Sequence, residues 1–586
     1  MKLLYNYRLL FGTVLLLSAA LLIYGCNDDF LVGQAQGTLD EQTLANEEGV
    51  EGNLIATYRM LGGFAGFGEW GVASSNWVFG SVASDDAYKG SEPGDQAPIT
   101  DVELYNWGTS GTDDYVNDKW SSVYEGIRRS NSTISLLDRL LDADPDQIAE
   151  ADANSIRGEA KFLRAHFHFD AWRMWENIPY YFEGDDDFRK TNVDVDVIAN
   201  ITEDLEQAID LLPETQRRSE AGRVTSWVAQ AYLGRVQMHA GDFQGALTTL
   251  RNVRNNGPFA LEENFHRVWS AFQDFANGPE TILAYQASSN DGNSEGQNAN
   301  HADRLNFPHS GSPFGCCGFH QPSQNLVNSF VVDSDGLPLG LFDNTWNDRD
   351  ENLAGGADVP VDPRLDWTVG RDNVPYKDWG NHRPGWIRDR GWAGPYSPKK
   401  NVHEDASDAE SNVGWLPNHL NSMNMHLYRY ADLLLLLAEA EVEVGSLDNA
   451  LEIVNEIRAR AGVAAQGPGE DRGSIAVPID DPSIEWANYS IGLYDSFPDQ
   501  DFARRAVRHE RRLELAMEGQ RFFDLRRWGI ADQVLNEYVE RERQRRSYLG
   551  GASTFSDRHR LYPIPTFQVD LSRVDGEERL VQNPGW

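Results

Sequence analysis

Cysteine is nearly absent from this 586-residue chain, which contains three of them. A fold held together by several disulfide bonds is therefore excluded. Cys316 and Cys317 are adjacent, and the sequence leaves open whether they are bonded or reduced in the loop 315–318. Two neighbouring thiols without a paired histidine also make a weak zinc site. The hydrophobic residues, at 40% of the chain, must therefore provide the stabilising core.

Positive charge is also scarce. The chain has eight lysines, a formal net charge of −40 and a pI near 4.6. Nucleic acid is excluded as a partner, because phosphate binding requires a positive surface. An acidic, lysine-poor surface suits a solvated extracellular protein, and it fits either a saline habitat or a GC-rich genome.

Signatures of known catalytic and cofactor sites are missing. We find no H-E-x-x-H, no G-x-S-x-G and no Walker P-loop. The segment 333–336 begins like a calcium loop, but its spacing does not follow the EF-hand pattern. Carboxylates are so abundant that counting them cannot identify a glycosidase pair. The sequence predicts a protein that is not an enzyme and that uses no cofactor and no metal.

Long apolar runs are limited to one, at 9–23, behind Lys2 and Arg8. This layout is typical of a secretory signal, and it is short for a membrane span of ~20 residues. The run ends at 23–26, Ile-Tyr-Gly-Cys, which resembles a bacterial lipobox. We therefore predict a signal peptide at 1–25, lipidation of Cys26 and a flexible acidic tether at 26–40, anchored by acyl chains. An ordinary secreted protein and an uncleaved anchor are the alternatives.

Apolar residues elsewhere recur at helical spacing. This pattern predicts helices at 41–62, 117–141, 154–175 and 195–212. Two helix–turn–helix pairs, at 224–239 with 243–253 and at 428–444 with 447–461, resemble tetratricopeptide units. These pairs lie too far apart in sequence for a simple array, so we expect one helical core assembled from distant parts of the chain. The stretch 256–425 is rich in Gly, Pro, Asn, Asp and Trp, which indicates long functional loops.

Arginine and glutamate alternate through 504–527. Glu510, Arg511, Glu514, Glu518 and Arg521 recur at intervals of three and four residues, a spacing at which side chains on one helix can pair. Arginine also forms bidentate bonds with carboxylates. We interpret this block as a structural ion-pair network that joins the last helix to the repeats, rather than as a catalytic or nucleic-acid site.

Motifs along nearly the whole chain resemble those of the SusD/RagB family of nutrient-uptake outer-membrane lipoproteins. Cys26 with Phe30 and Leu31 is similar to the family's N-terminus. The other matching segments are 158–165 (GEAKFLRA), 222–225, 322–330, 362–365, 428–435 with 438–440, 510–515 with 518–521 (ERRLEL, EGQR), 524–529, 561–565 and 582–586.

The resemblance implies an all-α fold of tetratricopeptide-like repeats with long loop-rich insertions. It divides the chain into an N-terminal SusD-like helical part at 41–255 and a C-terminal SusD/RagB part with ligand loops at 256–586. It also implies a lid over a SusC-like TonB-dependent outer-membrane barrel, which imports oligosaccharides or, in some relatives, peptides. The acidic residues 27–29 resemble the surface-export signal of Bacteroidetes-type lipoproteins, so we expect the protein on the outer membrane, facing the exterior.

Exposed aromatic rings beside polar groups are what a sugar-binding site requires, because sugars stack on rings through their C–H faces. Two regions, 66–107 and 340–396, supply this mixture. For any single tryptophan here core packing is favoured over ligand contact, although we expect two or three of the group to touch ligand. For Asp85 and Asp86 a solvated loop pair is the expectation, and cation binding is the alternative. The candidate ligand-binding residues are Trp70, Trp77, Asp85, Asp86, Trp107, Trp346, Tyr376, Trp379, Trp386, Arg388 and Trp392.

The sequence thus favours capture of a glycan and its delivery to a transporter. Peptide capture within the same family and a helical-repeat scaffold that binds protein are the alternatives. A surface glycan hydrolase is a further hypothesis, and only an activity assay distinguishes it from a glycan-binding protein.

Overall fold

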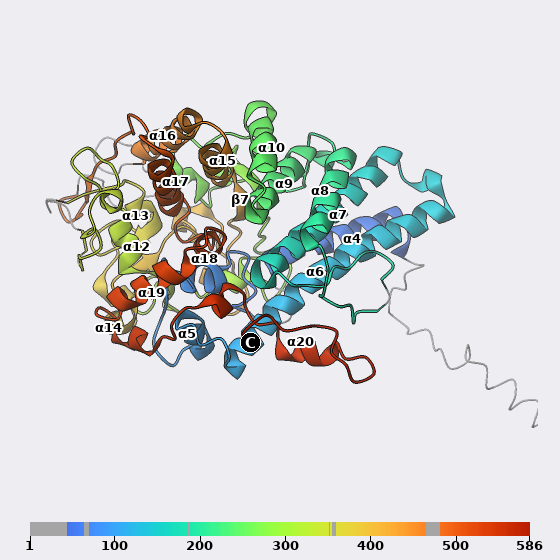
Figure 1. Cartoon of the computed structure of the whole chain (residues 1–586), viewed down its shortest axis with the longest axis horizontal. Coiled ribbons are helices and arrows are strands. Elements are labelled where there is room, and N and C mark those ends of the chain that lie inside the picture. The colour runs from blue at the N-terminus through green and yellow to red at the C-terminus, as the bar shows by residue number, and fades with distance from the viewer. Residues whose placement is uncertain (1–43, 64–68, 186, 351, 354–358, 465–480) are drawn as a thin grey trace, which may run out of the picture.

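The computed structural model describes residues 44–63, 69–185, 187–350, 352–353, 359–464 and 481–586 (Figure 1). The predicted signal peptide, Cys26 and the tether lie outside the described residues. Helices dominate the structure, which confirms the predicted fold class. The longer helices are α4 (Glu47–Tyr58), α5 (Ala97–Glu103), α6 (Ser110–Ala143), α7 (Glu150–Trp175), α8 (Val197–Leu211), α9 (Ser226–Ala240), α10 (Phe243–Asn256), α15 (Tyr430–Val444), α16 (Leu447–Val463), α17 (Gln500–Glu514), α18 (Arg521–Arg527) and α19 (Ala531–Glu542).

Both predicted helix–turn–helix pairs are present, as α9–α10 and α15–α16. Asp242 caps α10 by accepting a hydrogen bond from the backbone N–H of Gly245 at 2.9 Å, and Ser446 caps α16 in the same way. Gly241 turns the chain between α9 and α10 with φ +81°, a conformation that favours glycine. Gly234 lets the two helices approach closely, because a Cβ atom there would lie 2.4 Å from Leu250 Cδ2.

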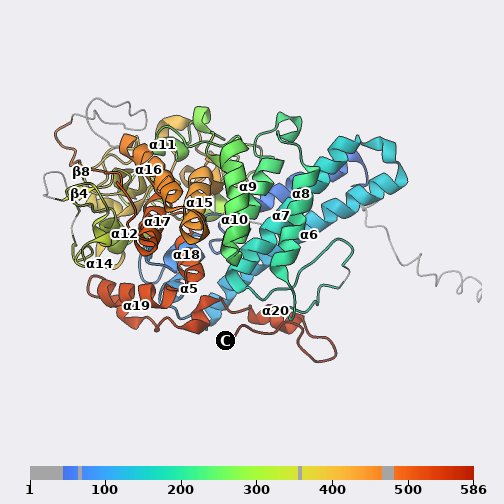
Figure 2. The same ribbon diagram turned by 45° about the horizontal axis from the view of Figure 1, so that its top comes forward.

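The helices form one continuous curved layer. Neighbours in sequence pack against one another from α6 to α10, and α10 then packs against α15, which contacts α16 and α17. Figures 1 and 2 show this succession across the molecule, with the loop-rich region gathered beside α15–α17. A single dominant hydrophobic core includes residues from all of these helices. The prediction of one core built from distant parts of the chain is therefore confirmed.

Short strands occur in four pairs that the sequence did not predict, because runs of two to five residues are too short to show alternation. One antiparallel pair joins β1 to β3 and so connects the N-terminal part to the loop-rich stretch. A second pair joins β2 to β7 directly before α15. The strands are β1 (Ala87–Gly90), β2 (Thr281–Tyr285), β3 (Phe319–Pro322), β4 (Pro360–Val361), β5 (Val369–Gly370), β6 (Ser397–Pro398), β7 (Met425–Arg429) and β8 (Asn488–Tyr489).

The arginine–glutamate block forms a buried ion-pair network, as predicted. Glu514 accepts hydrogen bonds from Arg429 and Arg364 at 2.7 and 2.8 Å. Glu510 accepts from Arg364 and Arg458 at 2.7 and 2.8 Å. The partners lie on β7, on α16 and in the segment after β4, not one turn away on α17. The network therefore fixes α17 to three segments that are distant in sequence.

The loop 315–318 contains a disulfide bond between Cys316 and Cys317, which selects one of the two states that the sequence left open. Cys317 is buried, and Cys316 is partly buried against the main core. Among the residues that the structure describes, no helix combines the length and the apolar character needed to cross a membrane.

Candidate ligand-binding site

Several of the aromatic candidates pack in the core. Trp77, Trp107, Tyr376 and Trp386 are all buried. The ring of Trp107 stacks on Tyr562 at 4.1 Å between centroids, and its indole N–H donates to the carbonyl of Val102 at 3.0 Å. These four rings therefore present no surface to a ligand in this conformation.

Asp85 and Asp86 are not the solvated pair that a loop position suggested, and in this respect the expectation was wrong. Both are 2% exposed. Arg521 donates to the carboxylate of Asp85 at 2.7 and 3.0 Å, and Arg512 donates to Asp86 at 3.0 Å. Burial raises the pKa of Asp85, but the charges of Arg512 and Arg521 outweigh it and lower that pKa to about 2. Both carboxylates belong to the structural ion-pair network.

The remaining candidates of the 340–396 region do not gather at one place. Trp379 packs against Phe314 at 4.7 Å, and its N–H donates to the carbonyl of His403. Trp392 stacks on Tyr548, and Trp346 is half-buried beside Gly340. Arg388 is exposed and pairs with two carboxylates, Glu92 at 2.9 Å and Asp95 at 2.7 Å.

Trp70 is brought together with two residues that the sequence analysis missed. The guanidinium carbon of Arg304 lies 5.0 Å from the ring centroid of Trp70 and 4.9 Å from that of Trp415. The cation therefore lies between two indole rings, an arrangement that the ring quadrupoles favour. Trp70 and Arg304 are almost fully buried, whereas Trp415 is 53% exposed. We call these three residues the Trp–Arg–Trp platform.

The loop that carries Trp415 is fixed to the segment that carries Arg304. The backbone N–H of Asn421 donates to the side-chain oxygen of Asn300 at 2.9 Å. His419 Nδ1 donates to the carbonyl of Arg304 at 2.8 Å, and its Nε2 lies 3.2 Å from the carbonyl of Phe314. Two residues that follow Trp415, His419 and Asn421, thus hold the loop to the segment that carries Arg304.

The segment 69–77 closes the platform from the other side. The indole N–H of Trp77 donates to the carbonyl of Ala302 at 3.5 Å, and the hydroxyl of Ser75 donates to the carboxyl of Asp303. Buried Trp77 and Ser75 therefore hold Ala302 and Asp303, the two residues directly before Arg304. Three loops that are distant in sequence form one preorganised surface.

The charges at the platform balance each other. Arg304 donates to the carboxylate of Glu69 at 3.3 Å, and the Glu69 side chain is 45% exposed. On the other side of the guanidinium, both ring nitrogens of His301 lie 3.1 Å from Arg304 Nη1. Burial and the charges of Arg304 and Arg59 lower the pKa of His301 to about 3, so its ring is neutral at pH 7. One cation facing one carboxylate leaves no excess charge for an ionic ligand.

The platform offers an open indole face beside fixed hydrogen-bonding groups. Trp415 presents its ring to solvent, and the half-exposed carboxylate of Glu69, held by buried Arg304, supplies an acceptor. This combination suits a sugar ring, which needs an apolar surface and polar partners for its hydroxyls. In the part of the chain that the structure describes, no group of three or more His, Cys, Asp or Glu side chains is placed to hold a metal ion.

We expect Asp303 to make the stability of the protein depend on pH. Its carboxyl is buried, and burial raises its pKa from 3.8 to about 7 although the hydrogen bond from Ser75 opposes this. The folded state then holds a proton that the unfolded state releases, so stability falls as the pH rises from about 4 to about 7 and stays lower above that. The change Asp303→Asn should therefore raise the melting temperature at pH 8 relative to the wild type by more than it does at pH 4. An equal change at both pH values would contradict this.

Comparison with known proteins places the chain in a family. The model of the SusD family matches residues 279–586, and a second model, described as starch-binding associating with outer membrane, matches residues 74–238. Because the first match covers more than half of the sequence, the chain belongs to the SusD family.

Relatives and solved structures are similar over most of the chain. SusD-like protein P38 of Formosa agariphila is 24% identical over 89% of this chain and 92% of its own. A SusD-like protein of Bacteroides ovatus is 22% identical over 97% and 95%. A laminarin binding SusD-like protein superposes with a TM-score of 0.66 at 23% identity, covering 92% of this chain and all of that one. Surface glycan-binding protein A from Bacteroides thetaiotaomicron, in complex with laminarihexaose, gives 0.63 at 18%, covering 92% and 99%. These structural likenesses establish the shared fold.

Proposed function

We propose that this protein binds a glycan at the surface of the outer membrane and delivers it to a SusC-like TonB-dependent transporter. Membership of the SusD family supports the proposal, and so do a structural neighbour described as laminarin binding and another in complex with laminarihexaose. The observation that carries it is the exposed indole of Trp415, fixed against Arg304 and Glu69.

Capture at the platform requires no chemical step. A sugar ring stacks on Trp415, and its hydroxyls donate hydrogen bonds to the half-exposed carboxylate of Glu69, which buried Arg304 holds in place. The surrounding loops are already fixed, so little conformational entropy is lost on binding. We therefore propose binding without catalysis, and new reducing ends after incubation of the pure protein with laminarin would contradict it.

Delivery requires the protein to stay at the membrane and beside its transporter. Lipidation of Cys26 would supply the anchor, because several acyl chains bind a bilayer firmly. The acidic residues 27–29 support export to the outer face, as in the lipoproteins that they resemble. A family model whose description includes association with the outer membrane supports the same location.

Replacing Trp415 by alanine tests the function. Truncation of a central aromatic contact costs about 2 kcal/mol or more, so we expect affinity for a bound glycan to fall roughly thirtyfold. The matched control is Phe342→Ala, because Phe342 is equally exposed at 53% and lies outside the platform. Isothermal titration of residues 27–586 with laminarihexaose measures the affinity of each variant. A glycan array tests binding of other classes of glycan. Binding of peptides but of no glycan would replace this proposal by peptide capture.

A further inference from the structure

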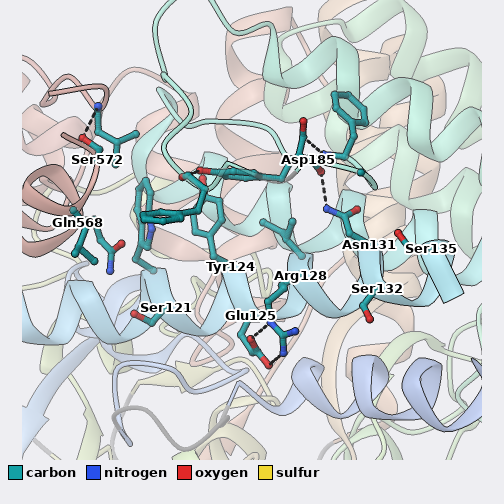
Figure 3. A pocket seen from close by; sticks show the side chains of 18 of the residues that line it. Ser121, Tyr124, Glu125, Arg128, Asn131, Ser132, Ser135, Asp185, Gln568 and Ser572 are labelled. Carbon is teal, nitrogen blue, oxygen red and sulfur yellow. Dashed lines mark hydrogen bonds and ion pairs between the residues drawn. The ribbon is translucent and has the colours of Figure 1, made fainter. Parts of the chain in front are cut away.

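A groove of about 630 Å³ runs along α6, on a surface that shares no residue with the platform (Figure 3). Its floor is α6, and its walls are residues of 181–185 with Phe188 and the chain from α20 (Thr566–Leu571) to Leu580. This volume lies within the range of roughly 300–1,000 Å³ that small-molecule sites occupy.

The rings that line the groove are held in place by the protein. Tyr124 stacks on Trp120 at 4.6 Å and meets the edge of Tyr181 at 5.7 Å. The hydroxyl of Tyr124 donates to the carbonyl of Pro179 at 3.1 Å, and the amide of Asn131 donates to the carbonyl of Tyr181 at 3.1 Å. The aromatic surface is therefore formed before any ligand arrives.

Hydroxyl and amide groups also line the groove. Ser121, Ser132 and Ser135 of α6 line the groove, and Gln568 of α20 lines its far end (Figure 3). An apolar helix or loop of a protein partner would cover these groups without satisfying them, which is unfavourable. A ligand with its own hydroxyls can exchange hydrogen bonds with them.

Three of the charged groups that line the groove, Glu125, Arg128 and Asp185, are held in ion pairs. Arg128 donates to both carboxylate oxygens of Glu125 at 2.7 and 2.8 Å, and Arg129 donates to the same carboxylate. Lys190 donates to Asp185 at 2.7 Å. Paired charges in a chain of net charge −40 favour an uncharged ligand over an anionic one.

We infer that this groove is a second carbohydrate site, which takes a short segment of a neutral glycan. The inference rests on the proposed function, since it assigns to the groove the same class of ligand as the platform. The rigid rings match the apolar faces of an uncharged sugar. The hydroxyl and amide groups of the groove match the hydroxyl edges of the sugar, and the paired charges leave it without a charged partner. A polysaccharide long enough to reach both sites would bind more tightly than a hexasaccharide, because the second contact becomes intramolecular.

Two variants separate the groove from the platform. Phe182→Ala removes a lining ring that is 36% exposed, and Ser135→Trp fills the groove from α6 without deleting a ring. The control for the first is Phe567→Ala, since Phe567 is 58% exposed on α20 but does not line the groove. Melting temperatures of all variants verify that each is folded.

The experiment is isothermal titration with laminarihexaose, cellohexaose and maltohexaose on the wild type and on each variant. For a hexasaccharide that binds, we expect two sites per chain in the wild type and in Phe567→Ala. We expect one site in Phe182→Ala, Ser135→Trp and Trp415→Ala, and none when Ser135→Trp and Trp415→Ala are combined. A single site in the wild type that disappears with Trp415→Ala overturns the second site and leaves the proposed function intact. Absence of binding by the wild type to these sugars and to a glycan array overturns the proposed function itself.

Discussion

Replacing Glu514 by glutamine is expected to lower the free energy of unfolding by about 3–5 kcal/mol at pH 7, the typical cost of removing one partner from a buried ion pair. Glu514 is fully buried. Its carboxylate accepts hydrogen bonds from Arg429 and Arg364 at 2.7 and 2.8 Å, and a third bond comes from Arg460. A neutral amide would remove the carboxylate that these three arginines share, and its NH2 group could not accept their hydrogen bonds in a region that water does not reach.

The effect of the substitution should depend on pH. Burial raises the pKa of Glu514, but the charges of Arg460, Arg429 and Arg364 outweigh burial and hold that pKa well below its ordinary value of 4.5. A carboxyl whose pKa is lowered on folding contributes stability above its unfolded pKa and loses that contribution as the pH falls. The difference between wild type and Glu514→Gln should therefore be largest near neutrality and shrink below about pH 4.5.

Denaturant unfolding at several pH values measures this difference. The matched control is Glu537→Gln, whose side chain is 60% exposed and pairs with Arg541 at 3.5 Å. Exposed ion pairs contribute ~0–1 kcal/mol, so the control should be nearly neutral. A loss at Glu514 no larger than that of the control would mean that the buried network contributes nothing to stability.

The network illustrates what the sequence can and cannot predict. The spacing of Glu510, Glu514 and Glu518 suggested ion pairs on one helix face, but α17 ends at Glu514 and Glu518 lies beyond it. The spacing does not identify the partners, since Arg364 and Arg429 reach α17 only through the tertiary fold. Helices were predicted well because periodicity is a local property. The strand pairs were missed because each depends on a partner that is distant in the chain.

The candidate site shows the same limit. A tryptophan in a polar loop looks alike in sequence whether its ring faces solvent or the core, so half-exposed Trp415 and buried Trp77 could not be distinguished. Trp415 carried a weak signal, because it stands between Gly414 and Pro417, residue types that favour a turn, and turns lie mostly at the surface. Arg304 carried none, since its role comes from the rings that the fold places on both sides of it.

Replacing Trp107 by alanine should separate stability from binding. Trp107 is 1% exposed and stacks on Tyr562 near the C-terminus. Removing a buried indole leaves a cavity and typically costs 3–5 kcal/mol, so we expect a large fall in the free energy of unfolding. Because the ring contacts no part of the platform, the folded fraction should bind glycan with unchanged affinity.

The opposite pattern is expected for Trp415→Ala. This ring is half exposed, so its loss should change the free energy of unfolding by roughly 0.5 kcal/mol or less, a typical value for surface substitutions, while affinity falls. Denaturant unfolding measures the free energy of unfolding of both variants. Isothermal titration, at a temperature where each variant is folded, measures their affinities for glycan. Reduced affinity in folded Trp107→Ala would show that the region 66–107 contributes to binding through a residue that is buried in this conformation. Unchanged affinity would assign Trp107 to the core, and binding to rings that the fold leaves open to solvent.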